Sequence, residues 1–228
     1  MKSRLPFPIL HEDRDVIVID KPAGMLTTKT RAKERNTAEE WLNDYVRKGQ
    51  AKSRKHVWLV HRLDRETSGL LVFAKSPELQ HYMRTYWRQL VTKRTYVAVA
   101  EGIFEQKEGK ITTWLTEDKR NAMVYSSPVD DGGDIAITNY KVVRENADKN
   151  LSMVELNLET GRTNQIRVHL ASKGHPVSGD RKYGHGNEFS PADRLCLHAR
   201  VLEFIHPATE QTVHFETPVP KEFNRICQ

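Results

Sequence analysis

The segment His61–Glu66 places five ionisable side chains directly before an apolar run, Leu70–Ala74. Asp64 stands in this segment between Arg62 and Arg65. Neighbouring guanidinium groups favour the ionised form of a carboxyl group, and an ionised, desolvated carboxylate can act as a nucleophile or as a base. An aspartate that caps a turn at the start of a buried strand is the alternative. This segment by itself leaves both interpretations open.

The surrounding sequence predicts the elements that position this segment. A β-branched run that Pro22 and Gly24 stop, Asp15–Gly24, predicts a buried strand that ends in a turn. Thr37 and Glu40 have capping-box spacing at the start of a predicted helix over 36–49, which Gly49 ends. Ser76 and Pro77 begin a second predicted helix, and its apolar stripe is interpreted as core: Leu79, Tyr82, Met83, Tyr86, Trp87 and Leu90.

Strands dominate the rest of the chain. Residues 94–102 and 151–161 predict strands, residues 103–134 predict a hairpin, and residues 163–173 predict a short helix that Gly174 closes. The segment 197–220 predicts two strands joined by a turn that contains proline. Short turns between successive strands favour an α+β fold with a mixed, mostly antiparallel sheet flanked by helices and loops. Without repeats or a Ser/Gly-rich linker, residues 1–228 are expected to form a single domain.

Composition and charge limit the class of protein. Hydrophobic residues make up 38% and charged residues 29% of the chain, as in ordinary globular proteins. The apolar runs are far shorter than the roughly 20 residues that span a bilayer, and the start lacks the pattern of a signal peptide. We therefore expect a cytoplasmic protein that does not enter membranes.

The net charge of +6 favours a polyanionic partner such as nucleic acid. Residues 84–94 carry four basic side chains, two aromatic ones and no acidic one. This pattern is typical of RNA binding and equally of a solvated helix face.

The cysteines and histidines do not have the spacing of a metal site. Cys196 and Cys227 lie far apart, which predicts neither a disulfide nor a zinc site. His198, His206 and His214 recur every eight residues, and packed or solvated side chains account for them. We therefore expect no metal and no cofactor.

Four ordered stretches resemble the RluA family of pseudouridine synthases. His61–Ser76 resembles the catalytic motif, Asp20–Met25 the first motif, Lys93–Gly102 the tyrosine-bearing motif and Glu159–Gly184 the arginine-bearing motif. Together they extend from about residue 10 to residue 220, and four ordered motifs are far more specific than one. Several members carry an N-terminal S4 domain, and we expect this chain to resemble the members without one.

The resemblance implies isomerisation of uridine to pseudouridine within RNA, in a pseudouridine-synthase fold with a catalytic cleft across the sheet. It makes Asp64 the essential carboxylate, which attacks the sugar or the base or removes a sugar proton. Tyr96 would lie against the uracil and assist the final removal of the C5 proton, with a core aromatic as the alternative. Arg167 would pair with Asp64 and keep it ionised, with a solvated helix arginine as the alternative.

The resemblance also suggests which side chains contact RNA. Arg62 would contact the position that the extruded uridine vacates, and Arg65 is a further candidate beside it. Arg162 and Lys182 would contact phosphates, and Lys21, also a candidate, would shape the floor of the cleft. The chain departs from the family at Asn164, where members commonly have histidine.

Two other functions compete with the enzyme. A non-catalytic RNA-binding or assembly factor on the same scaffold would not require Asp64, Tyr96 and Arg167 together, and all three are present. A hydrolase that uses Asp64 with a metal would need a second acidic ligand, where the motif has arginines. We expect a monomer that acts on a stem-loop of tRNA or large-subunit rRNA, read by its shape and a flipped base.

Overall fold

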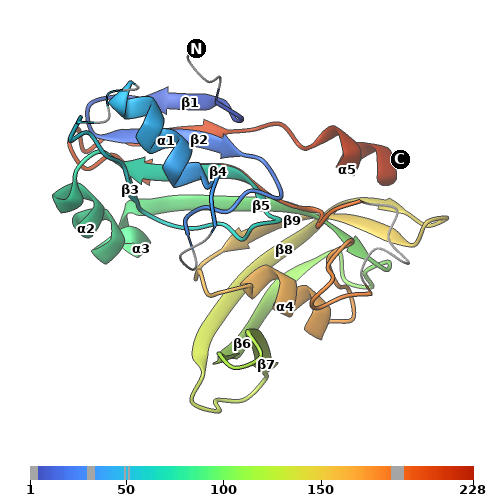
Figure 1. Cartoon of the computed structure of the whole chain (residues 1–228). Coiled ribbons are helices and arrows are strands. Elements are labelled where there is room, and N and C mark those ends of the chain that lie inside the picture. The colour runs from blue at the N-terminus through green and yellow to red at the C-terminus, as the bar shows by residue number, and fades with distance from the viewer. Residues whose placement is uncertain (1–4, 30–33, 49, 51, 186–192) are drawn as a thin grey trace. The chain divides into compact units, whose positions relative to one another are not determined.

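The structure is a computed structural model that describes residues 5–29, 34–48, 50, 52–185 and 193–228. Its chain forms two compact units, and most of their elements are labelled in Figure 1. The first unit comprises Met1–Thr92 and Val201–Thr217, and the second comprises Lys93–Arg200 and Pro218–Gln228. Strands β5 (Val91–Glu101) and β10 (Leu197–Ile205) contribute residues to both units.

Antiparallel strands form the core of the first unit. Strand β2 pairs with β1 on one side and β4 on the other, β3 pairs with β4, and β11 pairs with residues 201–205 of β10. Their bounds are β1 (Ile9–Glu12), β2 (Val16–Lys21), β3 (Trp58–Leu59), β4 (Ser68–Ala74) and β11 (Thr212–Glu216). Every residue of β4 is buried, so the apolar run after Asp64 is a core strand as predicted.

Helix α1 (Ala38–Arg47) begins with the predicted capping box. The Glu40 N–H donates to the Thr37 hydroxyl, and the Thr37 N–H donates to the Glu40 carboxylate, each over 3.2 Å. The helix ends at Arg47, and Lys48 follows in the left-handed conformation with a φ of 51°. Gly49, the predicted end, lies outside the described residues.

The predicted helix that begins at Ser76 is divided into α2 (Pro77–Thr85) and α3 (Trp87–Leu90). Met83 and Leu90 are buried in a core cluster with residues of β2, β4 and β10. Tyr82 and Tyr86 are 44% and 45% exposed, so their assignment to the core was wrong. Successive residues of a helix point about 100° apart around its axis. A predicted stripe that includes both Tyr82 and Met83 is therefore wider than the helix face that packs against the core, and only Met83 lies on that face.

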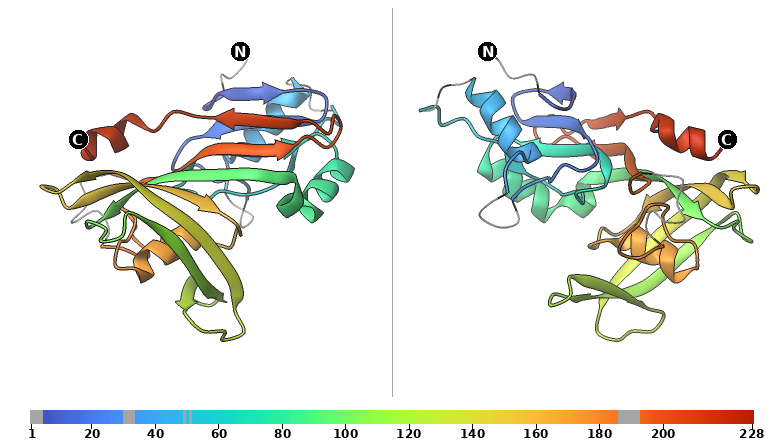
Figure 2. Two further views of the ribbon diagram at one scale, coloured as in Figure 1. Left: turned by 180° about the vertical axis from the view of Figure 1, so that it is seen from behind. Right: turned by 45° about the vertical axis from the view of Figure 1, so that its right-hand side comes forward.

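The second unit contains a sheet in the order β5-β9-β8-β6-β7, in which each neighbouring pair is antiparallel. Its further strands are β6 (Glu108–Asp118), β7 (Met123–Ser127), β8 (Asp134–Asn146) and β9 (Leu151–Leu158). Strands β6 and β8 run side by side along most of their length (Figure 2). The hairpin predicted within 103–134 is present as β6 and β7.

Helix α4 (Gln165–Ser172) contacts β6, β7 and β8. Ile166 and Leu170 are buried, so these two side chains anchor the helix. A short helix that the sequence did not predict, α5 (Lys221–Ile226), follows β11. The α+β fold with mostly antiparallel strands is confirmed. Within the described parts of the chain, no helix has both the length and the apolar character needed to cross a membrane.

Candidate active site

Asp64 lies in the loop between β3 and β4, and buried neighbours hold its backbone. The preceding residue, Leu63, is buried, and its N–H donates to the Thr27 hydroxyl over 3.3 Å. The same hydroxyl donates to the Leu63 carbonyl over 2.7 Å, and Thr27 is itself buried. On the other side, the Thr67 N–H donates to the Asp64 carbonyl over 3.2 Å. The loop therefore presents the Asp64 side chain from a fixed backbone.

Lys21, at the end of β2, connects the first motif to the Asp64 loop. Its side chain has no exposed surface, and its ammonium group donates to the carbonyls of Pro22, Met25 and Arg65. The corresponding distances are 2.9, 2.7 and 3.1 Å. A buried ammonium group that makes these bonds is not available to a phosphate, so a contact of Lys21 with RNA is not supported. Its predicted role in shaping the floor of the site fits this position.

The two arginines beside Asp64 are exposed. Arg62 makes no hydrogen bond or ion pair with any other residue that the structure describes. Arg65 Nη2 lies 2.8 Å from Glu34 Oε1 in an ion pair whose side chains are 51% and 33% exposed. Exposed ion pairs contribute little to stability. A phosphate group could therefore replace Glu34 at low cost, and both arginines remain candidates for RNA contacts.

Arg167 of α4 is held by a buried carboxylate that the sequence analysis did not single out. Arg167 Nε and Nη2 donate to the two Asp180 carboxylate oxygens over 2.7 and 2.8 Å. Asp180 is 1% exposed and also accepts hydrogen bonds from the Lys182 and Tyr183 N–H groups. Burial acts to raise the pKa of Asp180, but the bonds from Arg167 and these N–H groups outweigh it and lower that pKa below its ordinary value.

Asn164 and Tyr183 complete the surroundings of Arg167. The Asn164 amide oxygen accepts a hydrogen bond from Arg167 Nη1 over 2.8 Å, and its nitrogen donates to the Tyr183 hydroxyl over 3.2 Å. Arg167 Cζ lies 5.1 Å from the centre of the Tyr183 ring. Asn164 has a φ of 53°, a conformation that asparagine tolerates better than most residues. The amide therefore fits both the backbone and the hydrogen bonds at this position.

The turn before α4 is tied to neighbouring strands. The Gln165 amide accepts from the Thr160 hydroxyl and donates to the Ile137 carbonyl, over 2.8 and 3.0 Å. Arg94 donates to the Thr160 carbonyl over 2.9 Å and lies against Gly161. A Cβ atom at Gly161 would lie 2.7 Å from Arg94 Nη1, so a larger residue there would have to displace the end of the Arg94 side chain.

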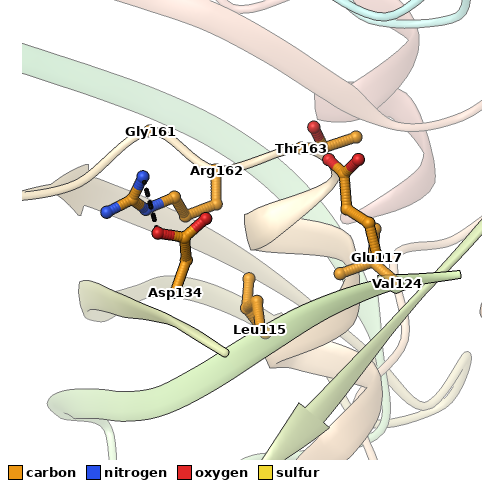
Figure 3. A pocket seen from close by; sticks show the side chains of 7 residues that line it. All are labelled: Leu115, Glu117, Val124, Asp134, Gly161, Arg162 and Thr163. Carbon is orange, nitrogen blue, oxygen red and sulfur yellow. Dashed lines mark ion pairs between the residues drawn. The ribbon is translucent and has the colours of Figure 1, made fainter. Parts of the chain in front are cut away.

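Arg162 lines a polar cavity of about 180 Å³ in the second unit (Figure 3). Its Nη1 lies 3.2 Å from Asp134 Oδ1, and both side chains are exposed. The Lys182 ammonium group contacts the Ala122 carbonyl and lies 5.2 Å from the centre of the Tyr183 ring. The predicted phosphate contacts of Arg162 and Lys182 stay predictions. The cavity beside Arg162 and Asp134 is also lined by Leu115, Glu117, Val124, Gly161 and Thr163.

Tyr96 lies on β5 opposite Leu156 of β9 and is 8% exposed. The neighbouring Thr95 hydroxyl donates to the Asn157 amide across the same two strands. The paired strands therefore fix the backbone of Tyr96, and its role against uracil stays a prediction.

A comparison with known protein families identifies the family to which this chain belongs. Residues 15–172 match the family described as RNA pseudouridylate synthase. The chain belongs to the RNA pseudouridylate synthase family. It is accordingly an RNA-modifying isomerase, and the RluA resemblance is confirmed.

Three relatives illustrate this membership. The chain is 38% identical to "Uncharacterized RNA pseudouridine synthase YhcT" of Bacillus subtilis, over 96% of the chain and 71% of that protein. It is 35% identical to "Dual-specificity RNA pseudouridine synthase RluA" of Vibrio cholerae, over 87% of the chain and 77% of that protein. "Ribosomal large subunit pseudouridine synthase D" of Neisseria meningitidis serogroup A is 37% identical over 96% of the chain, which spans 59% of that protein.

A solved structure supports the fold. "Human RNA Pseudouridylate Synthase Domain Containing 4" superposes with a TM-score of 0.75 at 24% identity, over 96% of this chain and 90% of that one. The architecture of this pseudouridylate synthase is therefore that of its family.

One cluster in the described residues of this synthase has the composition of a metal site: Asp13, Asp15 and His206. The Asp13 and His206 side chains already contact each other and the backbone. His206 Nδ1 accepts from the Ala208 and Thr209 N–H groups, so the proton of the neutral ring lies on Nε2, 3.1 Å from Asp13 Oδ2. A metal at Nε2 would have to displace this proton, and we interpret the cluster as a structural contact between Asp13 and His206.

The sequence analysis of this synthase missed Asp180, Tyr183 and the buried state of Lys21. Asp180 and Tyr183 lie inside the arginine-bearing motif, in the segment Gly179–Gly184. An aspartate followed by a turn and a tyrosine was the available signal, but sequence spacing does not show that it reaches Arg167.

Proposed function

We propose that this synthase converts a uridine in a stem-loop of tRNA or large-subunit rRNA to pseudouridine, with Asp64 as the essential carboxylate. The observation that carries the proposal is the position of Asp64, on a loop that Thr27 and Thr67 hold and inside the segment that matches the family. A fixed backbone favours reaction because the reactive group loses less conformational entropy when it reaches the transition state.

The reaction detaches uracil from C1′, rotates it and joins C1′ to C5. Asp64 attacks the sugar or the base or removes a sugar proton, and the base must first leave the RNA stack to reach it. Arg167 serves as the cationic partner of the Asp64 carboxylate, and Asp180 fixes the orientation of Arg167. Tyr96 lies against the uracil and assists the loss of the C5 proton.

RNA contacts come from exposed or half-exposed cations in the two segments that carry Asp64 and Arg167. Arg62 and Arg65 flank Asp64 in the sequence, and Arg162 and Lys182 lie within the arginine-bearing motif. The names of two relatives refer to the ribosomal large subunit and to dual specificity. The first name supports large-subunit rRNA as a substrate class, and tRNA rests on the family resemblance.

The proposal includes the state in which the protein works. A basic chain that modifies RNA is expected in the cytoplasm, as a monomer that needs neither metal nor cofactor. Residues 1–228 would act as one catalytic domain, in which Asp64, Tyr96 and Arg167 serve the same uridine.

Pseudouridine mapping tests the proposal. Unmodified tRNA and large-subunit rRNA are incubated with wild-type protein, with Asp64→Asn and with Asp44→Asn, and carbodiimide adducts are located by primer extension. Asp44 is an exposed residue of α1 and controls for the chemical change itself. A new site is expected with wild type and Asp44→Asn, and none with Asp64→Asn although RNA binding persists.

Other outcomes would reject the assignments. Turnover by Asp64→Asn near the wild-type level would show that Asp64 is not the essential carboxylate. RNA binding without a new pseudouridine in either RNA class would reject this substrate assignment and favour the alternative, an RNA-binding or assembly factor on the same scaffold.

A further inference from the structure

Two exposed tyrosines form a pair at the end of α2. The ring centres of Tyr82 and Tyr86 lie 5.0 Å apart with an interplanar angle of 47°. Neither hydroxyl has a hydrogen-bond partner within the described parts of the chain. The family resemblance assigns no role to these side chains, and the fold does not bury them. Their aromatic faces are therefore available to a ligand from solution.

Two arginines accompany this tyrosine pair. Arg84 and Arg88 are exposed, and neither makes an ion pair or hydrogen bond with a residue that the structure describes. The sequence contains no Asp or Glu between Leu79 and Ala100. The positive charge of this segment is consequently not neutralised by neighbouring carboxylates along the chain, which favours an anionic ligand.

The opposite face of the same segment is packed against the core and against the Asp64 loop. Met83 and Leu90 are buried in the core cluster of the first unit. The Trp87 ring stacks on His61, with centres 4.9 Å apart and an interplanar angle of 20°. The Gln80 amide donates to the Leu59 carbonyl over 3.0 Å. The exposed face is therefore held on a rigid support that also carries the segment with Asp64.

Exposed aromatic rings beside arginines are the combination by which proteins bind unpaired nucleotides. Bases stack on the rings, and the guanidinium groups contact the phosphates. A protein partner would use the rings as well, but it would have to supply carboxylates to match Arg84 and Arg88. RNA supplies one phosphate per nucleotide and is already the substrate class of the family.

We propose that the exposed α2–α3 face, which extends from Tyr82 and Tyr86 on one flank to Arg84 and Arg88 on the other, binds single-stranded nucleotides that adjoin the target stem-loop. Tyr82 and Tyr86 stack on unpaired bases, and Arg84 and Arg88 contact their phosphates. The inference rests on the proposed function in that the substrate is RNA. It adds a contact outside the reacting uridine and so a source of affinity that does not depend on Asp64.

Binding of a fluorescent oligouridylate to the full chain tests this surface. The Tyr82→Ala/Tyr86→Ala variant should bind roughly 30-fold more weakly or worse, because two stacked bases are lost and each contributes roughly 5-fold or more. The Tyr82→Phe/Tyr86→Phe variant keeps both rings and should bind like wild type. Both variants should fold, since the changed side chains are exposed, and circular dichroism checks this.

The salt dependence separates the arginines from the tyrosines. Loss of two phosphate contacts in Arg84→Ala/Arg88→Ala should reduce the slope of log K against log salt by about 1.4, while the tyrosine variants keep the wild-type slope. Lys221→Ala/Arg225→Ala removes the same charge from α5, where both side chains are exposed, and should leave the slope nearly unchanged. Photocross-linking with 4-thiouridylate should label Tyr82 or Tyr86.

Each contrary result overturns the inference. Wild-type affinity in the Tyr→Ala variant would do so, as would an equal loss of slope in the α5 control. A variant that changes only the oligomeric state would show that the face binds protein. Failure of the proposed function is seen separately, as absence of pseudouridine in the mapping experiment, because oligouridylate binding requires no catalysis.

Discussion

Arg167 and Asp180 form a two-pronged ion pair, with Nε and Nη2 of the arginine 2.7 and 2.8 Å from the two carboxylate oxygens. The Asp180 side chain is completely buried and that of Arg167 is 13% exposed. The pair joins α4 to the turn that follows Gly179. Two parallel hydrogen bonds fix the plane of a guanidinium group as well as its position, so Asp180 decides where the remaining donors of Arg167 point.

Asp180→Asn should lower both activity and stability. The amide keeps the size of the side chain but removes its charge, which leaves a nearly buried guanidinium group without its carboxylate. We expect the free energy of unfolding to fall by about 3 kcal/mol and kcat to fall more than KM rises. Asp148→Asn, an exposed change in the same unit, is the control for urea unfolding and steady-state kinetics. Full activity with unchanged stability would contradict the positioning role.

Arg167→Lys should be nearly as inactive as Arg167→Ala. A lysine keeps the positive charge but cannot bind both Asp180 oxygens and the Asn164 amide in the planar geometry of the guanidinium group. Single-turnover rates of pseudouridine formation measure the difference. Recovery of most of the wild-type rate by lysine would show that charge alone is required and that the Asp180 pairing is incidental.

Lys21→Met and Arg62→Ala should give opposite results. The first removes three hydrogen bonds from a fully buried ammonium group to carbonyls and should lower the melting temperature. The second removes an exposed side chain and should weaken RNA binding and its salt dependence without changing the melting temperature. Thermal unfolding and binding at several salt concentrations distinguish them. A stable Lys21→Met protein with a reduced salt slope would restore Lys21 as an RNA contact.

Gly179→Ala should destabilise the chain much more than Gly174→Ala. Both glycines have a positive φ, 78° and 79°, which costs alanine about 1 kcal/mol. At Gly174 nothing lies within 4 Å of the added Cβ, whereas at Gly179 it would lie 2.1 Å from the Arg194 carbonyl oxygen. The backbone beside Asp180 would have to move. Equal losses of unfolding free energy in the two variants would mean that this close approach can relax freely.

Two buried histidines should make the second unit less stable in acid. Burial lowers the pKa of His169 and of His198 to about 4, assisted by Lys173 and Arg194 respectively. From the ordinary value of 6.5 down to 4, the unfolded chain binds protons that the folded chain excludes, so stability falls as pH falls through this range. The loss approaches about 3 kcal/mol per histidine near pH 4.

The variant His169→Gln tests this account. Glutamine can keep hydrogen bonds to Thr113 and Thr138, which both contact the imidazole. Between pH 6.5 and 4 the unfolding free energy should depend less steeply on pH in the variant than in the wild type. The slopes should differ by about 1.4 kcal/mol per pH unit, which corresponds to the uptake of one proton on unfolding. Above pH 7 the slopes of variant and wild type should coincide. An unchanged slope in acid would show that His169 is protonated in the folded chain.

Local sequence patterns determined most elements and the motif that contains Asp64. The Thr37 capping box and the apolar run of β4 are patterns within a few residues, so the sequence shows them directly. The four ordered motifs identified the protein family and therefore its reaction, because far fewer families match four segments in order than match one segment.

Tertiary structure alone decided the partners of these residues. Whether Tyr82 is buried depends on how much of α2 packs against β4, and whether Lys21 is exposed depends on carbonyls as distant in sequence as Arg65. Asp180 lies 13 residues from Arg167, a separation set by the loop between them rather than by any helical or strand period. Hydrogen bonds act through distance and direction in space, and these are fixed only when the whole chain has folded.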